Sequence, residues 1–461
     1  MSSAQEFRKQ TTLRNLEAIY RTYVKSNSAI GRDGNHPARL GGSLNEEVRQ
    51  IQKNMRNGNY RFTPFRQVLK IKGASQNPRV ISIPTARDRI TLRALTNTLS
   101  SSFNLEEFER PQLKINRISN AIAKNAYEEY IRVDIEDFYP TIDHEKLILE
   151  LQTRIRKHEI LSILSRAVST PTIANSQPRS QPITSQGVPQ GLSISNILAE
   201  IFMIPIDKNF MNLPGMSYFR YVDDILILCH TGMADQIEQN LDSEISARGL
   251  KAHPRGPGKK SSTGRIVDQF DYLGYVFNGT KISVRGSSIH RMENSIARVF
   301  TRYKYATKSS RVGFTMESWI RRSGEICEWY LNLVITGCIH EGRRHGWLQY
   351  FSQMDDIKIL KKLDRQVRKF VSSYDLSATV VPKKFVSTYW AIQNPNSRRR
   401  NIVPNFDEID RDNKQNILNR IFLIKQERLN EMNEIEVNSL FSRKVGKATS
   451  DLEKDIGSVY R

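Results

Sequence analysis

The sequence predicts an α+β protein whose C-terminal third is helical. Strand-like segments with period-two or continuous apolar patterns alternate with helix-like segments up to about residue 285. Beyond that point the pattern is mainly helical and basic, with one extended interruption at 377–390. No internal repeat is present in the sequence, which excludes a solenoid. An α+β core followed by an α-rich appendage therefore fits best.

Composition and charge limit the function classes. Its 461 residues, 38% of them hydrophobic, suffice for a large core or several subdomains. Lys and Arg outnumber Asp and Glu 70 to 48, and this net charge of +22 predicts a polyanionic partner. Because no basic amphipathic helix with an aromatic face stands out, nucleic acid is favoured over anionic lipid. Charge alone does not distinguish a polymerase from a passive binder.

The cellular location is predicted from features that the sequence lacks. No apolar run approaches the ~20 residues that span a bilayer, and the N-terminus has no signal-peptide core. The three cysteines are too few and too scattered for a disulfide framework or a zinc site. We therefore expect a cytoplasmic protein with reduced thiols and no membrane partner.

The N-terminal elements follow in order. Residues 1–60 alternate helix-like stretches with a glycine-rich break at 31–43. Strand-like segments at 60–71 and 78–84 predict a hairpin with a basic loop. The apolar spacing at 87–103 predicts an amphipathic helix.

The central segment contains acidic residues at strand ends. Residues 129–143 contain a strand that is expected to turn at Pro140, followed by a helix. Residues 184–210 are a loop that leads into a long apolar helix. A strand–turn–strand hairpin with Asp-Asp at its tip is predicted at 218–230, and another hairpin at 270–284.

Three carboxylates carry the chemistry. Asp134 follows one apolar strand, and Asp223 and Asp224 interrupt another, where an uncompensated charge is costly. Carboxylates gathered at strand ends repel one another unless a cation joins them, and two Mg²⁺ ions held this way support phosphoryl transfer. The bland alternative for each signal is ordinary turn chemistry.

Several motifs in family order resemble those of reverse transcriptases. They are YVDD at 221–224, VDIEDFYPTIDHEKL at 133–147, QGVPQGLSISNILAEIFM at 186–203, RVISIPTARDRI at 79–90, GRDG at 31–34 and FDYLGYVF at 270–277. The resemblance implies a right-hand polymerase with fingers, a palm of antiparallel sheet and helices, a helical thumb and a helical C-terminal extension. The implied ranges are 1–120 for the N-terminal extension and fingers, 121–282 for the palm, 283–375 for the thumb and 376–461 for the extension.

The resemblance assigns catalytic and metal-binding roles. Asp134 and Asp223 are expected to be the principal ligands of two Mg²⁺ ions, with Mn²⁺ as an alternative. Asp224 is the second acid of the pair and is expected to bind metal less directly. The backbone carbonyl of Ile135 also faces a metal in this assignment.

The resemblance also assigns nucleotide contacts. The ring of Tyr139 is placed beneath the incoming sugar, where it would clash with a 2′-hydroxyl; the alternative is plain core packing. Gln190 and Gly191 match the pair near nucleotide and template, where glycine permits close backbone approach. Lys72 and Arg79 lie in the fingers hairpin and are expected to pair with the triphosphate.

Primer and duplex contacts are implied further along the chain. Tyr272, Leu273 and Gly274 correspond to the primer grip. HGWLQYF at 345–351 resembles the thumb of group II intron enzymes, and the basic helix after it is expected to track a duplex by its phosphates. The alternative is a basic bundle face with the aromatic residues in its core.

The last segment allows two interpretations. SRRRN at 397–401 and a heptad-like helix at 417–441 are consistent with RNA binding and oligomerisation. A solvated charge run and a helix packed on the thumb are equally consistent with the pattern.

The function implied by the resemblance is RNA-directed DNA synthesis from dNTPs, with an RNA template or structured non-coding RNA and a DNA product. Group II intron and retron signatures are incomplete: 109–119 replaces the usual segment before the first catalytic motif, and no nuclease pattern follows the thumb. The implied subgroup is therefore the bacterial reverse transcriptases of antiphage defence, acting as a homo-oligomer or with a second defence protein. Untemplated or protein-primed synthesis, an RNA polymerase and a catalytically silent RNA-binding scaffold remain alternatives.

Overall fold

The computed structural model divides the chain into two compact units. It describes residues 2–71, 77–105, 110–178, 182–256, 258–396 and 402–453. The first unit comprises Met1–Glu109 and Tyr127–Arg265, and the second comprises Arg110–Ala126 and Ile266–Arg461. These boundaries differ from those of the four domains implied by the sequence, whose ranges stay a prediction.

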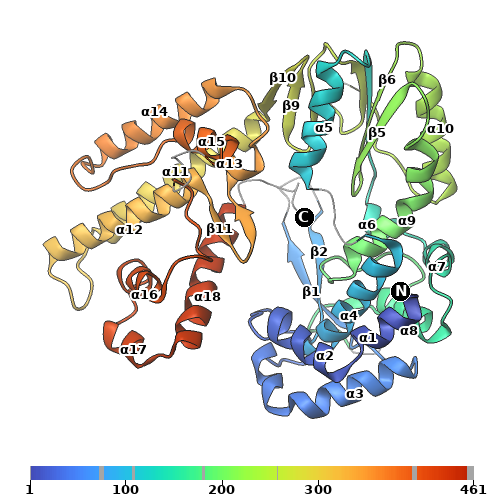
Figure 1. The fold of residues 1–461 in the computed structure, drawn as a ribbon, viewed down its shortest axis with the longest axis horizontal. Helices are drawn as coiled ribbons and strands as arrows, with labels where there is room; N and C mark the ends of the chain where they lie inside the picture. The colour runs from blue at the N-terminus through green and yellow to red at the C-terminus, as the bar shows by residue number, and fades with distance from the viewer. Residues whose placement is uncertain are drawn as a thin grey trace. The chain divides into compact units, whose positions relative to one another are not determined.

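The first unit combines two sheets with surrounding helices (Figure 1). Its elements are α1 (Ser3–Gln10), α2 (Leu13–Ile19), the π-helix η1 (Tyr20–Val24), the 3₁₀ helix η2 (Pro37–Ser43), α3 (Leu44–Arg56), β1 (Phe65–Lys70), β2 (Arg79–Ile83), α4 (Ala86–Phe103), β3 (Glu129–Asp134), α6 (Phe138–Thr141), α7 (His144–Gln152), α8 (His158–Ser169), β4 (Thr172–Ile173), α9 (Ser195–Phe210), β5 (Met216–Tyr221), β6 (Asp224–Cys229), α10 (Ala234–Ala247) and β7 (Ser262–Arg265).

A four-stranded antiparallel sheet forms the centre of this unit. Its strand order is β5-β6-β3-β7, and β6 and β3 occupy the middle. Helices α9 and α10 pack against its strands. Five of the six residues of β6 are buried, which accounts for the uninterrupted apolar sequence after Asp224. The predicted hairpin at 218–230 is confirmed as β5 and β6.

The smaller sheet of the first unit has the order β2-β1-β4. β1 and β2 pair antiparallel, which confirms the predicted hairpin, and β1 pairs parallel with β4. Helix α4 follows and confirms the predicted amphipathic helix; the Thr85 hydroxyl caps it by accepting a hydrogen bond from the Asp88 backbone N–H. The hairpin connection includes Lys72, which lies outside the described residues.

The second unit is mainly helical. Its elements are α5 (Pro111–Ala123), β8 (Phe270–Tyr272), β9 (Tyr275–Asn278), β10 (Lys281–Val284), α11 (Gly286–Ala306), α12 (Met316–Thr336), β11 (Cys338–His340), β12 (Arg343–His345), α13 (Trp347–Tyr350), α14 (Ile357–Ser373), α15 (Phe385–Gln393), α16 (Arg411–Arg420), α17 (Gln426–Glu431) and α18 (Glu434–Glu453). Within the described ranges, no helix combines the length and apolar character needed to cross a membrane.

Aromatic side chains fill the core of the second unit. Trp347, Tyr350 and Phe351 are at most 1% exposed, so they are core residues, as one of the two interpretations of this segment held. The Tyr275 hydroxyl donates to the Tyr350 carbonyl at 2.5 Å, and the Tyr350 hydroxyl donates to the Leu273 carbonyl at 2.9 Å. These bonds tie the β8–β9 turn to α13, which satisfies buried polar groups in an apolar core.

Several predicted elements differ from the structure. The strand at 129–143 ends at Asp134, and Pro140 lies inside the short helix α6 rather than at a strand turn. The predicted hairpin at 270–284 is a three-stranded meander, β8-β9-β10. The hairpin β11–β12 interrupts the helical third and was not predicted. Residues 385–390, expected to be extended, belong to α15.

The predicted heptad-like helix at 417–441 is wrong. The structure has three helices there, α16, α17 and α18, and Leu423 adopts a left-handed φ of 57° between the first two. An L-residue with this backbone conformation ends a helix. Helix α16 packs against α12 and α18 instead of presenting a long seam, which supports the packed interpretation of this helix. SRRRN at 397–401 lies outside the described residues.

The central strand is predicted to dominate the stability of the first unit. Ile227 in β6 is 0% exposed, and Ile227→Ala should cost about 2–5 kcal/mol because it opens a cavity in a packed sheet. Urea unfolding measures this change. The control Ile435→Ala removes the same atoms from a side chain that is 80% exposed and should cost less than about 0.5 kcal/mol. Equal losses for the two variants would contradict the assignment of β6 to the core.

Candidate active site

Strand register brings the three predicted acids together. Asp134, the last residue of β3, pairs with Asp224, the first residue of β6. Asp223 lies beside them in the β5–β6 turn, and its carbonyl accepts a hydrogen bond from the Ile135 backbone N–H at 3.2 Å. The acids come from positions about ninety residues apart in sequence, so only the sheet pairing makes them neighbours.

The β5–β6 turn differs from the predicted one. Tyr221 and Asp224 pair across it, so the two turn residues are Val222 and Asp223, not the two aspartates. Val222 has φ 59°, as the first central residue of a tight two-residue hairpin requires. A β-branched residue there is a strained choice where glycine is usual.

The carboxylate of Asp224 is neutralised by an arginine. Arg132 on β3 approaches it with Nε at 3.2 Å from Oδ1 and Nη2 at 3.3 Å from Oδ2. The two side chains are 8% and 15% exposed, so this is a partly buried, two-pronged pair. Asp224 is thus paired with a protein cation, and its expected lesser role in metal binding stays a prediction.

Asp134 is surrounded by groups from the loop before β7. Its Oδ1 lies 3.2 Å from His253 Nε2 and 3.4 Å from Lys260 Nζ. The Asp134 backbone N–H donates to Ser261 Oγ at 3.1 Å, and its carbonyl accepts from the His253 backbone N–H at 2.8 Å. The end of β3 is therefore fixed on both its backbone and its side chain.

Asp223 is the acid with the most perturbed ionisation. Burial, followed by the negative charges of Asp134 and Asp224, raises its pKa from 3.8 to about 6. The positive charge of Arg79 acts in the opposite direction but does not cancel these effects. The ionised form of Asp223 is thus disfavoured by burial and by its two acidic neighbours, and a bound cation would offset both effects.

A buried arginine holds the turn that carries Asp223. Arg220 on β5 donates from Nη1 to the Val222 carbonyl at 2.9 Å. Its other nitrogens bind Glu200 at 2.7 Å and Asp207 at 2.5–2.7 Å, both on α9. The roles of Arg220 and Arg132 were not predicted, although a charged residue inside each apolar strand is a signal that could have marked them.

The donor set suits a hard divalent cation. Asp134, Asp223 and Asp224 offer carboxylate oxygens, the ligand type that Mg²⁺ and Mn²⁺ prefer. The Ile135 carbonyl accepts no hydrogen bond from any described residue, so its oxygen is also available as a metal ligand. Within the described ranges, however, no three His, Cys, Asp or Glu side chains are arranged to enclose a metal. Arg132 and Lys260 compensate the acids instead, and His253 lies beside Asp134.

Tyr139 lies close to the acids and is held in place. It is partly buried, and its hydroxyl donates to Asn196 Oδ1 on α9 at 2.9 Å. Burial and then the charge of Asp223 raise the pKa of its phenol, so the ring stays neutral. A fixed neutral ring beside Asp223 is compatible with the predicted contact to a sugar.

Arg79 and Gln190 carry polar atoms without partners. Arg79, the first residue of β2, places its charge within reach of Asp223 and Tyr139. Its Nε is buried and, among the described residues, has no hydrogen-bond partner; the same holds for Gln190 Oε1. Buried polar groups normally find partners, so these atoms are candidates for binding a ligand.

The backbone of Gly191 lies close to strand β2. A Cβ at this residue, whose φ is 98°, would lie 2.8 Å from Ile81 Cγ2 of β2. The adjacent Gln190 carbonyl accepts a hydrogen bond from the Ser82 backbone N–H at 2.7 Å. Glycine is therefore required here by contact with β2, and its predicted contact with nucleotide stays a prediction.

The predicted primer grip belongs to the second unit. Tyr272, Leu273 and Gly274 form the β8–β9 turn and are all buried. Leu273 and Gly274 adopt positive φ values of 50° and 82°, as this two-residue turn demands. The buried side chains of Tyr272 and Leu273 stabilise the unit, and contact with a primer stays a prediction.

Comparison with known families identifies the domain that contains the acids. Residues 69–277 match the family described as reverse transcriptase (RNA-dependent DNA polymerase). This stretch is a reverse transcriptase domain. The match and the antiparallel sheet around the acids confirm the predicted fold class, an α+β polymerase of the right-hand type.

The reverse transcriptase domain also has curated relatives. It is similar to the uncharacterized 91 kDa protein in cob intron of Schizosaccharomyces pombe, 28% identical over 203 residues. It is similar as well to the group II intron-encoded protein LtrA of Lactococcus lactis subsp. cremoris, 24% identical over 179 residues. These matches cover 41% and 37% of this chain, and only 24% and 29% of the two relatives.

Among solved structures, the chain is similar to apo telomerase from Candida tropicalis. The TM-score is 0.42 at 13% identity, and the match covers 91% of this chain and 74% of the telomerase chain.

The raised pKa of Asp223 predicts that the stability of the protein depends on pH. Its folded-state pKa of about 6 exceeds the ordinary 3.8. Protonation of Asp223 therefore favours the folded state, and this contribution to the free energy of unfolding is lost as pH rises through about 6. In metal-free buffer, Asp223→Asn should therefore stabilise the protein at pH 8 by about 1–3 kcal/mol, and the gain should shrink toward pH 4.5. Urea unfolding at several pH values measures it. The exposed Asp235→Asn should show no such trend, and an identical trend in both variants would refute the account.

Proposed function

We propose that the chain is an RNA-directed DNA polymerase that adds deoxynucleotides to a primer hydroxyl. The observation that carries the proposal is the register of β3 and β6, which sets Asp134 against Asp224 with Asp223 in the adjoining turn. This constellation lies inside the stretch that matches the reverse transcriptase family. The chain spans about a quarter of its curated relatives, so their other activities are not carried over.

The proposed division of labour follows the charges. Asp134 and Asp223 would hold two Mg²⁺ ions, aided by the Ile135 carbonyl, while Asp224 stays with Arg132. The bound ions supply activation of the attacking oxygen and charge neutralisation at the phosphates. Arg79, whose Nε lacks a protein partner among the described residues, is placed to bind the triphosphate.

Tyr139 and Gln190 are proposed to select and position the nucleotide. The Tyr139 ring, fixed by Asn196, would exclude a 2′-hydroxyl by contact. Gln190 offers an Oε1 that has no partner among the described residues, and Gly191 keeps the adjacent backbone against β2. Correct placement of the reacting groups supplies much of the rate in such a transfer.

The wider biological role is proposed from the sequence. The net charge of +22 supports an RNA template or structured non-coding RNA as partner, with a DNA product. The incomplete group II intron and retron signatures support a role in bacterial antiphage defence, in the cytoplasm, as a homo-oligomer or with a second defence protein. The basic helix α14 is proposed to follow the product duplex by its phosphates.

Loss of one acid should separate catalysis from RNA binding. With Mg²⁺, dNTPs and a primed RNA template, Asp223→Asn should lower nucleotide incorporation at least about 10³-fold, because the site loses a principal metal ligand. RNA affinity, measured by filter binding, should change less than about twofold. Asp235→Asn, the same chemical change on an exposed residue of α10, should leave both unchanged.

The outcomes distinguish the alternatives. Extension by Asp223→Asn at the wild-type rate would refute the site assignment. Incorporation by the wild type without template, or onto a protein hydroxyl, would favour untemplated or protein-primed synthesis by the same site. RNA binding without metal, and no incorporation under any priming condition, would favour the silent scaffold.

The Tyr139 ring tests sugar selection. Tyr139→Val should lower the preference for dNTPs over rNTPs by at least about tenfold, since the side chain that meets the 2′-hydroxyl is shortened. Tyr139→Phe keeps the ring, loses only the bond to Asn196 and should retain the preference. Single-nucleotide kcat/KM values measure it. Unchanged rNTP use by Tyr139→Val would show that the ring is a core residue only.

A further inference from the structure

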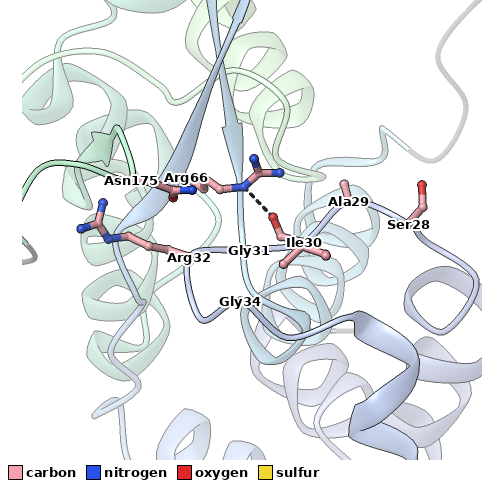
Figure 2. A pocket seen from close by; sticks show the side chains of 8 residues that line it. All are labelled: Ser28, Ala29, Ile30, Gly31, Arg32, Gly34, Arg66 and Asn175. Atoms are coloured by element: carbon pink, nitrogen blue, oxygen red, sulfur yellow. Dashed lines mark hydrogen bonds between the residues drawn. The ribbon is translucent and has the colours of Figure 1, made fainter.

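A pocket in the first unit is lined by residues other than the three acids. It has a volume of about 670 Å³ and is lined by Ser28, Ala29, Ile30, Gly31, Arg32, Gly34, Arg66 and Asn175 (Figure 2). That volume is within the range of sites that hold small molecules. None of its lining residues is one of the three acids, and the proposed polymerase reaction does not use it.

Arginines shape the wall of this pocket. The Arg66 Nε donates to the Ile30 carbonyl at 2.7 Å, as Figure 2 shows, and the Arg89 Nη2 donates to the Ala29 carbonyl at 2.6 Å. Arg32 reaches across to the loop after β4 and donates to the carbonyls of Ala174, at 2.5 Å, and Gln177. Hydrogen bonds from guanidinium groups to backbone carbonyls thus hold the loop that contains Ala29, Ile30 and Arg32 in place.

Glycine allows this loop to press against the start of α4. A Cβ at Gly31 would lie 2.7 Å from the Thr85 Cα, which leaves no room for a side chain. The pocket wall is therefore a packed backbone whose shape is set by contacts on both sides.

The guanidinium groups keep unsatisfied donors. Among the described residues, Arg32 Nε and Arg89 Nη1 are buried without a hydrogen-bond partner. Both Nη atoms of Arg66 likewise make no hydrogen bond to a described residue. Burial lowers the pKa of Arg89; the charge of Asp33 acts in the opposite direction, and the neighbouring charge of Arg66 lowers it further. Arg32 and Arg66 line the pocket, and Arg89 lies near Arg66 behind its wall. Guanidinium donors that have no partner among the described residues favour a multiply charged anion here.

Asp33 offsets part of this charge, since its carboxylate acts on Arg89. Asp33 lies in the same loop, is exposed and accepts a hydrogen bond from the Asn35 backbone N–H at 3.3 Å. No salt bridge joins Arg32, Arg66 or Arg89 to an acid within the described ranges. The neutral Asn175 amide completes the lining and offers both a donor and an acceptor.

We propose that this pocket binds a terminal phosphate group, carried by the end of an RNA strand or by a free nucleotide. A phosphomonoester is a dianion at neutral pH and presents three acceptor oxygens, which match the free guanidinium donors. An internal phosphodiester has one charge and two free oxygens and satisfies fewer of them. The proposal is independent of polymerase activity.

The experiment compares RNA ends in the absence of divalent metal. Fluorescence anisotropy with the full-length protein, in EDTA, gives the affinity for a short RNA with a 5′-phosphate, a 3′-phosphate or neither. We expect one phosphorylated end to bind about tenfold more tightly than the unphosphorylated RNA. Competition by AMP, with adenosine as its control, would assign the site to a free nucleotide, and failure of AMP to compete would assign it to the RNA end.

Paired variants connect the effect to this pocket. Arg66→Gln should abolish the gain from phosphate, and Arg61→Gln, the same change at an exposed arginine outside the pocket, should retain it. Asn175→Asp places a negative charge on the exposed rim without removing a structural contact and should also abolish it, whereas Ser176→Asp on the next residue should not. These rim variants answer the question even if Arg66→Gln does not fold.

Two results would overturn the proposal. One is equal affinity for phosphorylated and unphosphorylated RNA together with no binding of AMP. The other is a phosphate-dependent gain that survives both Arg66→Gln and Asn175→Asp, because the phosphate would then be bound elsewhere.

Discussion

The gathering of three carboxylates at the ends of β3 and β6 is the constraint on which the first unit depends. Like charges at this spacing, partly shielded from water, destabilise the sheet unless nearby cations compensate them. Arg132 and Lys260 supply part of that compensation, and His253 lies beside Asp134. Asp223 remains under-compensated, as its raised pKa shows. The sheet thus tolerates a local electrostatic cost at the position where a cation would relieve it.

The support around this site is built from buried charge. Arg220 joins the β5–β6 turn to two acids of α9, so the turn and the helix belong to one ionic network. Removing one member of such a network leaves the others buried and unpaired, which is more costly than the pair is favourable. The network also accounts for how Val222 is kept at a backbone conformation that a β-branched residue rarely adopts.

The sequence predicted the acids and the hairpin because both have local signatures. An apolar run broken by Asp-Asp, and the turn residues around it, can be recognised without knowledge of any distant contact. The partners of the acids could not be predicted in this way, since Arg132 meets Asp224 only through the β3–β6 register. The pocket is similar: GRDG marked the loop, but Asn175 lies more than 140 residues away in sequence. The prediction of one helix at 417–441 was wrong because heptad spacing does not reveal that Leu423 adopts a left-handed backbone conformation.

Helix α5 belongs to the second unit although the chain on both sides of it belongs to the first. The backbone therefore passes between the units three times, near residues 109, 126 and 265. Inside the second unit, the amide of Asn116 on α5 donates to Gln353 Oε1 at 3.2 Å, and Ile115, Ile118 and Ile122 of the same helix are buried. A cut at any single crossing would leave the halves joined by the other two. A fragment that starts at residue 266 would lack α5, whose apolar face is buried in the core of the second unit. The second unit is therefore completed by a segment that is synthesised between two parts of the first.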